Sequence, residues 1–147
     1  MQEQATERMI VRASLDRCVA VALDVEHYPE WAADIKEVEV LARDAEGRAE
    51  RVRFRAAAFG RSTTYTLLYD HAQAPHLLSW KLEEGDLTGV LDGWYSFEAV
   101  DSGDTEVTYH LVVELLLPLP GFVKRRAEGR IMHTALQELK ARAEATS

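Results

Sequence analysis

The sequence predicts an α+β domain in which a curved antiparallel sheet wraps around one long C-terminal helix. Residues 120–145 carry apolar side chains at the spacing of a long amphipathic helix. Residues 36–117 instead alternate apolar and polar side chains with the period of two that is typical of β-strands. Turn residues divide this stretch into consecutive strands, which form an antiparallel sheet with one apolar face, and the helix is the one element able to cover that face.

The composition is typical of one domain with its own core. The chain has 147 residues, of which 47% are hydrophobic, so we expect a single domain over residues 1–147 with an ordered core at about 7–143. Acidic residues outnumber basic ones by 25 to 17, and the net charge of −8 argues against a nucleic-acid partner. The single cysteine, Cys18, excludes an internal disulfide and is expected to be a small core residue.

The expected location of the protein in the cell follows from the first residues and from the most apolar run of the sequence. Residues 1–11 lack the pattern of a signal peptide. The run at residues 111–123 is interrupted by a glutamate and two prolines and is too short to cross a bilayer as a helix. We therefore expect a cytoplasmic protein without a transmembrane segment.

The N-terminal part predicts one strand followed by two short helices. Residues 7–13 are rich in apolar and β-branched side chains, which favours a first strand. Ser14 is a suitable N-cap for a helix that continues to about Asp24. Pro29 interrupts the helical pattern, so a second short helix is expected at residues 28–31, with Trp31 packed into the core.

The second and third strands are expected to form a hairpin around a turn at residues 44–47. With this turn at the centre, Glu39 lies opposite Arg53, and Glu37 lies opposite Arg55. The basic stripe on the third strand is thus expected to form cross-strand ion pairs rather than an anion-binding surface.

Four more strands are expected at residues 63–71, 76–83, 87–100 and 105–117. Centring the last turn at residues 101–104 places Tyr95 opposite Tyr109. Phe97 then faces Val107. Apolar residues fall on the same face of both strands, which supports this register.

The long helix needs one buried stripe. At 100° per residue, one face carries Phe122, Arg125, Gly129, Met132, Leu136, Leu139 and Ala143. A glycine within a helix costs about 1 kcal/mol relative to alanine, so an inward Gly129 indicates close approach of a backbone or a ligand.

Five short motifs occur in order along the chain: Tyr28-Pro29-Glu30-Trp31, Ser79-Trp80, Asp92-Gly93-Trp94-Tyr95, Thr105-Glu106-Val107-Thr108-Tyr109 and Pro118-Leu119-Pro120-Gly121-Phe122. Together with the order of elements, they resemble the START-like polyketide cyclase/dehydrase family, which is related to coenzyme Q-binding proteins. The resemblance covers about residues 7–143. It implies a helix-grip fold, a seven-stranded sheet around a C-terminal helix, with a deep cavity for a hydrophobic ligand such as a lipid, quinone or polyketide.

The inner faces of the sheet and the helix supply the candidate ligand-binding residues. They are Phe54, Tyr65, Tyr69, Trp80, Tyr95, Phe97, Tyr109, Arg125, Gly129, Met132 and Leu136. A mostly apolar lining with a few polar groups is typical of a small-molecule pocket. The residues alone leave open whether these side chains line a cavity or fill a solid core.

An alternative function is that of a polyketide aromatase/cyclase or dehydratase acting in the same cavity. Such chemistry needs a donor to polarise a carbonyl and a base to remove an α-proton. Tyr95, Tyr109 and Arg125 are the catalytic candidates, and Tyr65 and Tyr69 come next.

No cofactor is expected. The five histidines are scattered without metal-ligand spacing, and one cysteine cannot form a metal cluster. His110 has the parity of Glu106 and Thr108, so it is expected on the outer face of the sheet and not as a catalytic base.

A third hypothesis is an interaction module that docks a membrane or a partner. Lys124, Arg125 and Arg126 follow the apolar run at residues 115–122, and this combination can contact anionic lipid headgroups. The simpler interpretation is a solvated cationic turn. These charges stand near the positive pole of the helix dipole, which is unfavourable unless an anion or an acidic neighbour offsets them.

Overall fold

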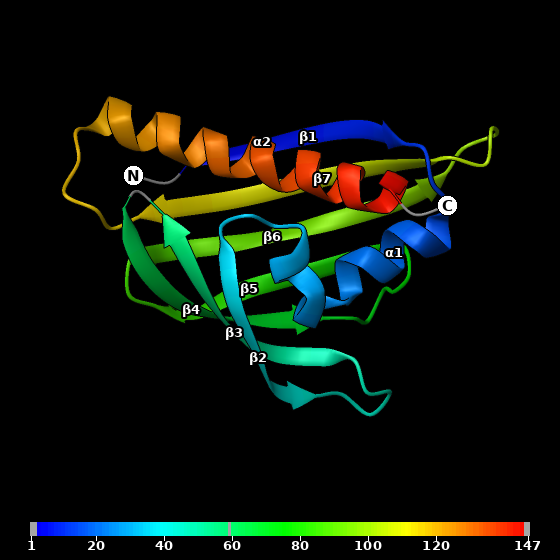
Figure 1. The fold of residues 1–147 in the computed structure, drawn as a ribbon, viewed down its shortest axis with the longest axis horizontal. Coiled ribbons are helices and arrows are strands. Elements are labelled where there is room, and N and C mark those ends of the chain that lie inside the picture. The colour runs from blue at the N-terminus through cyan, green and yellow to red at the C-terminus, as the bar shows by residue number, and fades with distance from the viewer. Residues whose placement is uncertain (1–2, 59, 146–147) are drawn as a thin grey trace.

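The computed structural model describes residues 3–58 and 60–145 and has the predicted α+β architecture (Figure 1). Its strands are β1 (Glu3–Val11), β2 (Ile35–Arg43), β3 (Ala49–Ala58), β4 (Arg61–Asp70), β5 (Leu77–Gly85), β6 (Thr88–Ala99) and β7 (Thr105–Leu115). The helices are α1 (Leu15–Leu23), the 3₁₀ helix η1 (Val25–Glu30) and α2 (Gly121–Ala145). The helix-grip arrangement, with two short helices between the first two strands, is confirmed.

The seven strands form one antiparallel sheet in the order β1-β7-β6-β5-β4-β3-β2. Strands β2 to β7 are joined by successive hairpins, while β1 pairs with β7 at the far edge. Helix α2 packs mainly on β1, β7 and α1, and the sheet curves beneath it (Figure 1). The concave face of the sheet therefore looks toward the helices, and the core lies between them.

The predicted strand registers are confirmed. Tyr95 pairs with Tyr109 across β6 and β7. Glu37 pairs with Arg55 across β2 and β3, and the Arg55 Nε donates to a Glu37 carboxylate oxygen at 2.8 Å. These exposed charges pair with each other on the outer face of the sheet rather than forming an anion-binding stripe, and solvent screening keeps their contribution to stability small.

Most element boundaries lie within two residues of the predicted ones, but two elements begin three or more residues earlier. Strand β1 begins at Glu3 rather than at residue 7, because it pairs with β7 along its whole length and Glu3 lies opposite Val113. The second helix begins at Val25 rather than at residue 28, and Pro29 lies within its last turn. Trp31 is only partly buried and packs against the rim of the core.

Cys18 is a core residue, as predicted. It lies on the inner face of α1 and has no exposed surface. Burial raises the pKa of the Cys18 thiol, and a hydrogen bond with the Thr105 side chain opposes this change. The thiol therefore stays protonated at neutral pH, which is typical of a structural cysteine.

Candidate ligand-binding site

Most of the predicted site residues do meet in the interior. Eight of them are buried in one hydrophobic cluster: Phe54, Tyr69, Trp80, Tyr95, Phe97, Tyr109, Met132 and Leu136. Tyr65 is partly buried and packs against this cluster. The alternation along each strand places these aromatic residues on the concave face, so the sequence parity was sufficient to find them.

The aromatic rings form a layer across the sheet in two groups of ring contacts, one around Phe54 and the other around Trp80. Tyr95 and Tyr109 stack with their ring centroids 4.7 Å apart. Trp80 lies 5.4 Å from Tyr95, and Phe54 lies 5.4 Å from Tyr65. Such offset and tilted contacts stabilise the layer by about 0.5–1.5 kcal/mol for each pair beyond area burial. The inner face of the sheet is thus a preformed aromatic surface.

All five tyrosines of the chain lie in this cluster or pack against it. The Tyr28 hydroxyl donates a hydrogen bond to the Ala22 carbonyl oxygen, and another hydrogen bond links it with the Tyr69 hydroxyl. Burial raises the pKa of every one of these phenols, and mutual electrostatic interactions raise several of them further. At neutral pH the five groups are therefore uncharged hydrogen-bond donors.

Three of these hydroxyls are left without a protein partner. Within residues 3–58 and 60–145, the structure describes no hydrogen bond for the hydroxyls of Tyr65, Tyr95 or Tyr109. The buried side-chain atoms without a partner in the described residues are His71 Nδ1 and Thr88 Oγ1, so the three tyrosine hydroxyls keep some accessible space around them. Ordered water or a ligand oxygen can provide the missing acceptors.

Two carboxylates lie near these hydroxyls. The negative charge of Glu138 on α2 raises the pKa of Tyr95, and that of Asp34 raises the pKa of Tyr65, although burial is the larger cause in both cases. A Glu138 carboxylate oxygen also accepts a hydrogen bond from the Ala33 backbone N–H at 3.0 Å. This contact ties the middle of α2 to the segment that leads into β2.

Tyr28 was missed as a site residue from sequence. It lies on η1, and its ring stacks on Phe54 with the centroids 6.1 Å apart. The sequence indicated Tyr28 only as part of the motif Tyr28-Pro29-Glu30-Trp31. A short 3₁₀ helix has no regular inner face from which its burial could be predicted.

Arg125 was wrongly placed in the cavity. It is exposed, and its guanidinium Nη1 lies 3.6 Å from the position that a Cβ on Gly121 would occupy, so the side chain turns back toward the start of α2. Phe122 is likewise 63% exposed. Arg125 and Phe122 lie on the same face of α2 as its buried residues. Figure 1 shows, however, that the first turn of α2 lies beyond the end of β7, where no strand covers it.

Gly129 does not mark a close approach to any part of the protein. Apart from the adjacent backbone of its own helix, no heavy atom would lie within 4 Å of a Cβ added there. The residue is partly buried and helical, so the absence of a side chain leaves open space at this point of α2. The expected close approach of a backbone is therefore wrong, and the expected approach of a ligand stays a prediction.

Glu128 is a second residue that sequence reasoning missed. Its side chain is 1% exposed, and a carboxylate oxygen accepts the Leu115 backbone N–H at 2.9 Å. This contact joins α2 to the last residue of β7. A glutamate next to Gly129 in a basic segment gave no signal, because helical periodicity alone does not predict burial of a charged residue.

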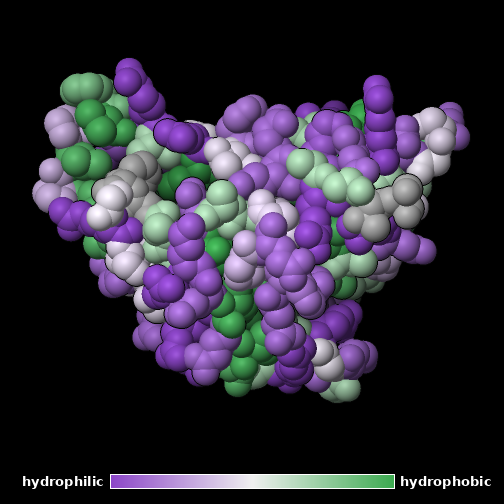
Figure 2. Space-filling model, in the orientation of Figure 1, coloured by the Kyte–Doolittle hydropathy of each residue, from purple (hydrophilic) through white to green (hydrophobic). Residues whose placement is uncertain are grey.

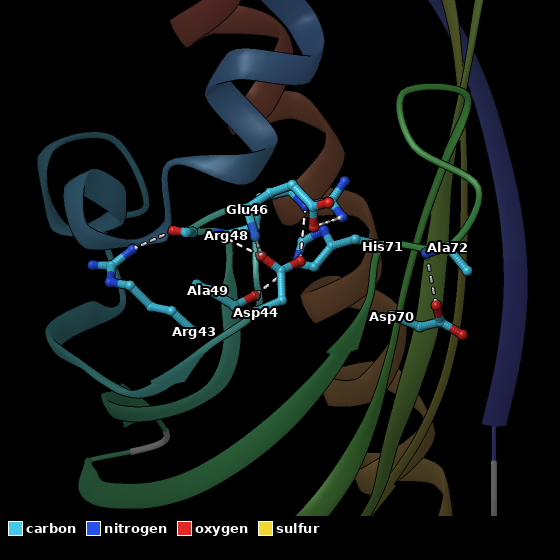
Figure 3. A network of polar contacts seen from close by, with 9 residues as sticks. Arg43, Asp44, Glu46, Arg48, Ala49, Asp70, His71 and Ala72 are labelled. Atoms are coloured by element: carbon cyan, nitrogen blue, oxygen red, sulfur yellow. Dashed lines mark hydrogen bonds and ion pairs between the residues drawn. The ribbon is translucent and has the colours of Figure 1, made fainter.

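Two cavities among the described residues lie at the ends of the sheet rather than beneath α2. One, of about 240 Å³, lies between α1, η1 and the β2–β3 hairpin and includes Arg43 and Arg48. Figure 3 shows that Arg48 is engaged by Asp44 and Glu46, and that the buried His71 contacts the Ala49 carbonyl oxygen. Arg43 pairs with Glu26 at 2.6 Å, so both arginines of this cavity are already paired and it is a poor candidate for binding a charged ligand.

The second cavity, of about 270 Å³, lies at the end of the sheet where β4 meets β5. It is lined by Thr64, Tyr65, Thr66, Glu84, Gly85 and Asp86. Tyr65 is the one predicted site residue that borders it. No residue of α2 lines either of these two cavities.

The described residues also bear on metals and membranes. No three His, Cys, Asp or Glu side chains in residues 3–58 and 60–145 are grouped so that they could hold a metal ion. No helix within those ranges is long and apolar enough to span a bilayer.

Comparison with known proteins places this geometry in a family. The profile of the polyketide cyclase / dehydrase and lipid transport family matches residues 2–144. This chain belongs to that family. Its curved seven-stranded antiparallel sheet and long C-terminal helix match the helix-grip START fold, as the sequence motifs predicted. A search of curated protein sequences gave no significant match.

Solved structures of START-like proteins share the fold. A START superfamily protein from Mycobacterium smegmatis is 24% identical, with a TM-score of 0.88 over 98% of this chain and 99% of that one. The Zhui aromatase/cyclase from Streptomyces sp. R1128 is 17% identical, with a TM-score of 0.83 over 98% and 94%. The two-domain aromatase/cyclase BexL is 18% identical, with a TM-score of 0.69 over 97% of this chain and 45% of its own. At these identities the likeness concerns the fold alone.

Proposed function

We propose that this family member binds a hydrophobic small molecule with oxygen acceptors, of the lipid, quinone or polyketide type, between the sheet and α2. The observation that carries the proposal is the set of tyrosine hydroxyls without protein partners inside an aromatic layer. Apolar rings supply the binding surface, and the neutral hydroxyls of Tyr65, Tyr95 and Tyr109 supply donors for carbonyl or hydroxyl oxygens of the ligand. The family description, which includes lipid transport, supports the same class of ligand.

Ligand entry would require the interior to rearrange. Helix α2 packs mainly on β1, β7 and α1, so the middle strands reach it chiefly through the aromatic side chains. A ligand would have to displace some of these rings from one another. Gly129 offers space for such a movement, because no other part of the protein occupies the position that a side chain would take there.

Direct detection of bound lipid and displacement of a fluorescent fatty-acid probe test this proposal. We expect organic extraction of the purified protein followed by mass spectrometry to recover a hydrophobic compound. Trp80→Ala should weaken the binding of the probe at least tenfold, because Trp80 is 7% exposed at the centre of the layer. Trp94→Ala is the matched control, since Trp94 stacks on His110, whose place on the outer face follows from its parity.

A more conservative pair of variants distinguishes a loss of binding from a loss of folding. Trp80→Ala removes a large buried ring and costs about 3–5 kcal/mol. Tyr95→Phe and Tyr109→Phe keep the packing and remove only hydroxyls, so they should fold normally and weaken the binding of an oxygen-bearing probe about three- to tenfold. Equal probe affinity in all of these variants, with no extractable compound, would rule out this site.

A second candidate function is cyclisation or dehydration of a polyketide in the same interior. The aromatase/cyclase activity named for two of the structural neighbours supports it. Tyr95 and Tyr109 are protonated donors that suit polarisation of a carbonyl. Arg125 cannot assist from its exposed position, so Glu138, which interacts with Tyr95, is the better candidate base. In a reconstituted polyketide synthase, Tyr95→Phe should then lower turnover at least tenfold while probe affinity falls less.

Docking to a membrane or a partner is compatible with either candidate function, because it would use other residues of the protein. Ligand binding depends on the aromatic layer, whereas docking depends on the surface at the start of α2.

A further inference from the structure

The connection from β7 to the first turns of α2, residues 116–126, forms an exposed apolar tip. Leu116, Leu119 and Phe122 are 54%, 37% and 63% exposed. They are three of the six large hydrophobic side chains exposed in residues 3–58 and 60–145, and they fall within seven residues. Figure 2 shows one group of green hydrophobic side chains at the upper left, the corner that holds the start of α2 in Figure 1, and a second green band low in the centre. An apolar cluster that protrudes in this way is typical of an interaction site.

Basic residues surround the tip on a protein that is otherwise acidic. Lys124, Arg125, Arg126 and Arg130 lie within seven residues of one another, although the net charge of the chain is −8. The first turn of α2 has no acidic residue, and the carboxylate of Glu128 is buried against Leu115. The positive end of the α2 dipole adds to this potential. The tip thus combines exposed apolar side chains with a local positive charge.

The backbone keeps these apolar groups exposed. The Leu116 N–H donates to the Leu87 carbonyl oxygen at 2.8 Å, which anchors the base of the tip to the connection between β5 and β6. Leu117 is buried, so the adjacent Leu116 points outward. The Leu119 N–H donates to the Leu117 carbonyl oxygen at 2.8 Å, which holds this part of the loop in a turn. Pro118 and Pro120 restrict the remaining freedom of the loop. The exposure of the tip is therefore a consequence of the fold.

We propose that this tip docks the protein onto an anionic lipid bilayer, with Leu116, Leu119 and Phe122 entering the interface and the basic residues contacting the headgroups. Charge complementarity favours such a surface. A convex tip of eleven residues is smaller than the 20–30 residues that each partner typically contributes to a stable protein interface. A bilayer needs no shape complementarity and accepts apolar and cationic groups side by side. This docking goes beyond ligand binding, since it uses none of the aromatic layer.

Vesicle sedimentation tests the electrostatic part. The protein should bind vesicles with 30% phosphatidylserine at low salt, bind pure phosphatidylcholine at least tenfold more weakly, and lose most of its binding at 0.5 M NaCl. The triple change Lys124→Gln, Arg125→Gln and Arg126→Gln should reduce partitioning about a hundredfold, at about fivefold for each charge.

A second triple change is the matched control. Arg51→Gln, Arg53→Gln and Arg55→Gln alter the net charge equally, but these arginines pair with Glu83, Glu39 and Glu37 on the sheet. This control should change partitioning less than threefold. If both triple variants lose binding equally, only the net charge matters and the proposal fails.

Phe122→Ala tests the apolar part and leaves the charge unchanged. Because Phe122 is 63% exposed, the variant should fold normally. We expect partitioning to fall on the order of tenfold. Leu68→Ala, which removes an exposed leucine of β4, should have little effect. Two results would overturn the proposal: vesicle binding that is unaffected by Phe122→Ala, or no binding of the unaltered protein to the anionic vesicles. Binding of the fatty-acid probe is measured in parallel, and it should be unchanged in every tip variant, so the two proposals can fail separately.

Discussion

Gly129 allows a direct measurement of whether the middle of α2 faces open space. A Cβ at this position would meet no heavy atom within 4 Å, and the residue is helical. In a helix interior, Gly→Ala stabilises by about 1 kcal/mol, because alanine loses less backbone entropy on folding. For a domain of this size, Gly129→Ala should therefore raise Tm by about 3 °C.

Gly93→Ala is the matched comparison, since it adds the same methyl group at a crowded position. There a Cβ would lie 2.4 Å from the His110 carbonyl oxygen and 2.9 Å from Trp80 Cζ2. The carbonyl belongs to the neighbouring strand and cannot withdraw without disturbing the pairing of β6 with β7. We expect a loss of about 2–3 kcal/mol, in the range of overpacked cores.

Thermal and urea unfolding followed by circular dichroism measure both variants. The urea slope should stay constant, so that a shifted midpoint reports stability alone. A neutral or destabilised Gly129→Ala protein would refute the inferred open space and restore the close approach that the sequence suggested. A tolerated Gly93→Ala would show that the packing of β6 on β7 is looser than described.

Two further predictions concern carboxylates that hold α2 in place. Glu128→Ala leaves the Leu115 N–H buried without an acceptor and should cost about 1–3 kcal/mol in urea unfolding, whereas Glu128→Gln should recover most of it; equal losses would contradict this role. Hydrogen bonds from the Arg12 N–H and from Lys140 hold the pKa of Glu144 below its usual value. The stability due to Glu144 is thus complete above about pH 4.5 and declines as the pH falls through the lowered pKa. Glu144→Gln should accordingly flatten the acid side of the stability profile, and an unchanged profile would argue against it.

Much of the fold and part of the site could be predicted because they depend on local patterns. A turn centred between two alternating strands fixes which residues face each other, and this alone gave the pairing of Tyr95 with Tyr109 and of Glu37 with Arg55. The same parity placed Trp80 on the inner face. Residues outside a regular period were missed: Tyr28 lies on a short 3₁₀ helix.

The sequence by itself determined the element order, the strand registers and the apolar faces, because period and turn chemistry are properties of neighbouring residues. The tertiary structure decided which of these faces are covered. Arg125 stands seven residues before Met132 and shares its phase, yet Met132 is buried and Arg125 is exposed, because the first turn of α2 extends past the sheet. Burial of Glu128 and the open space at Gly129 likewise depend on what lies opposite each residue, which no spacing along the chain specifies.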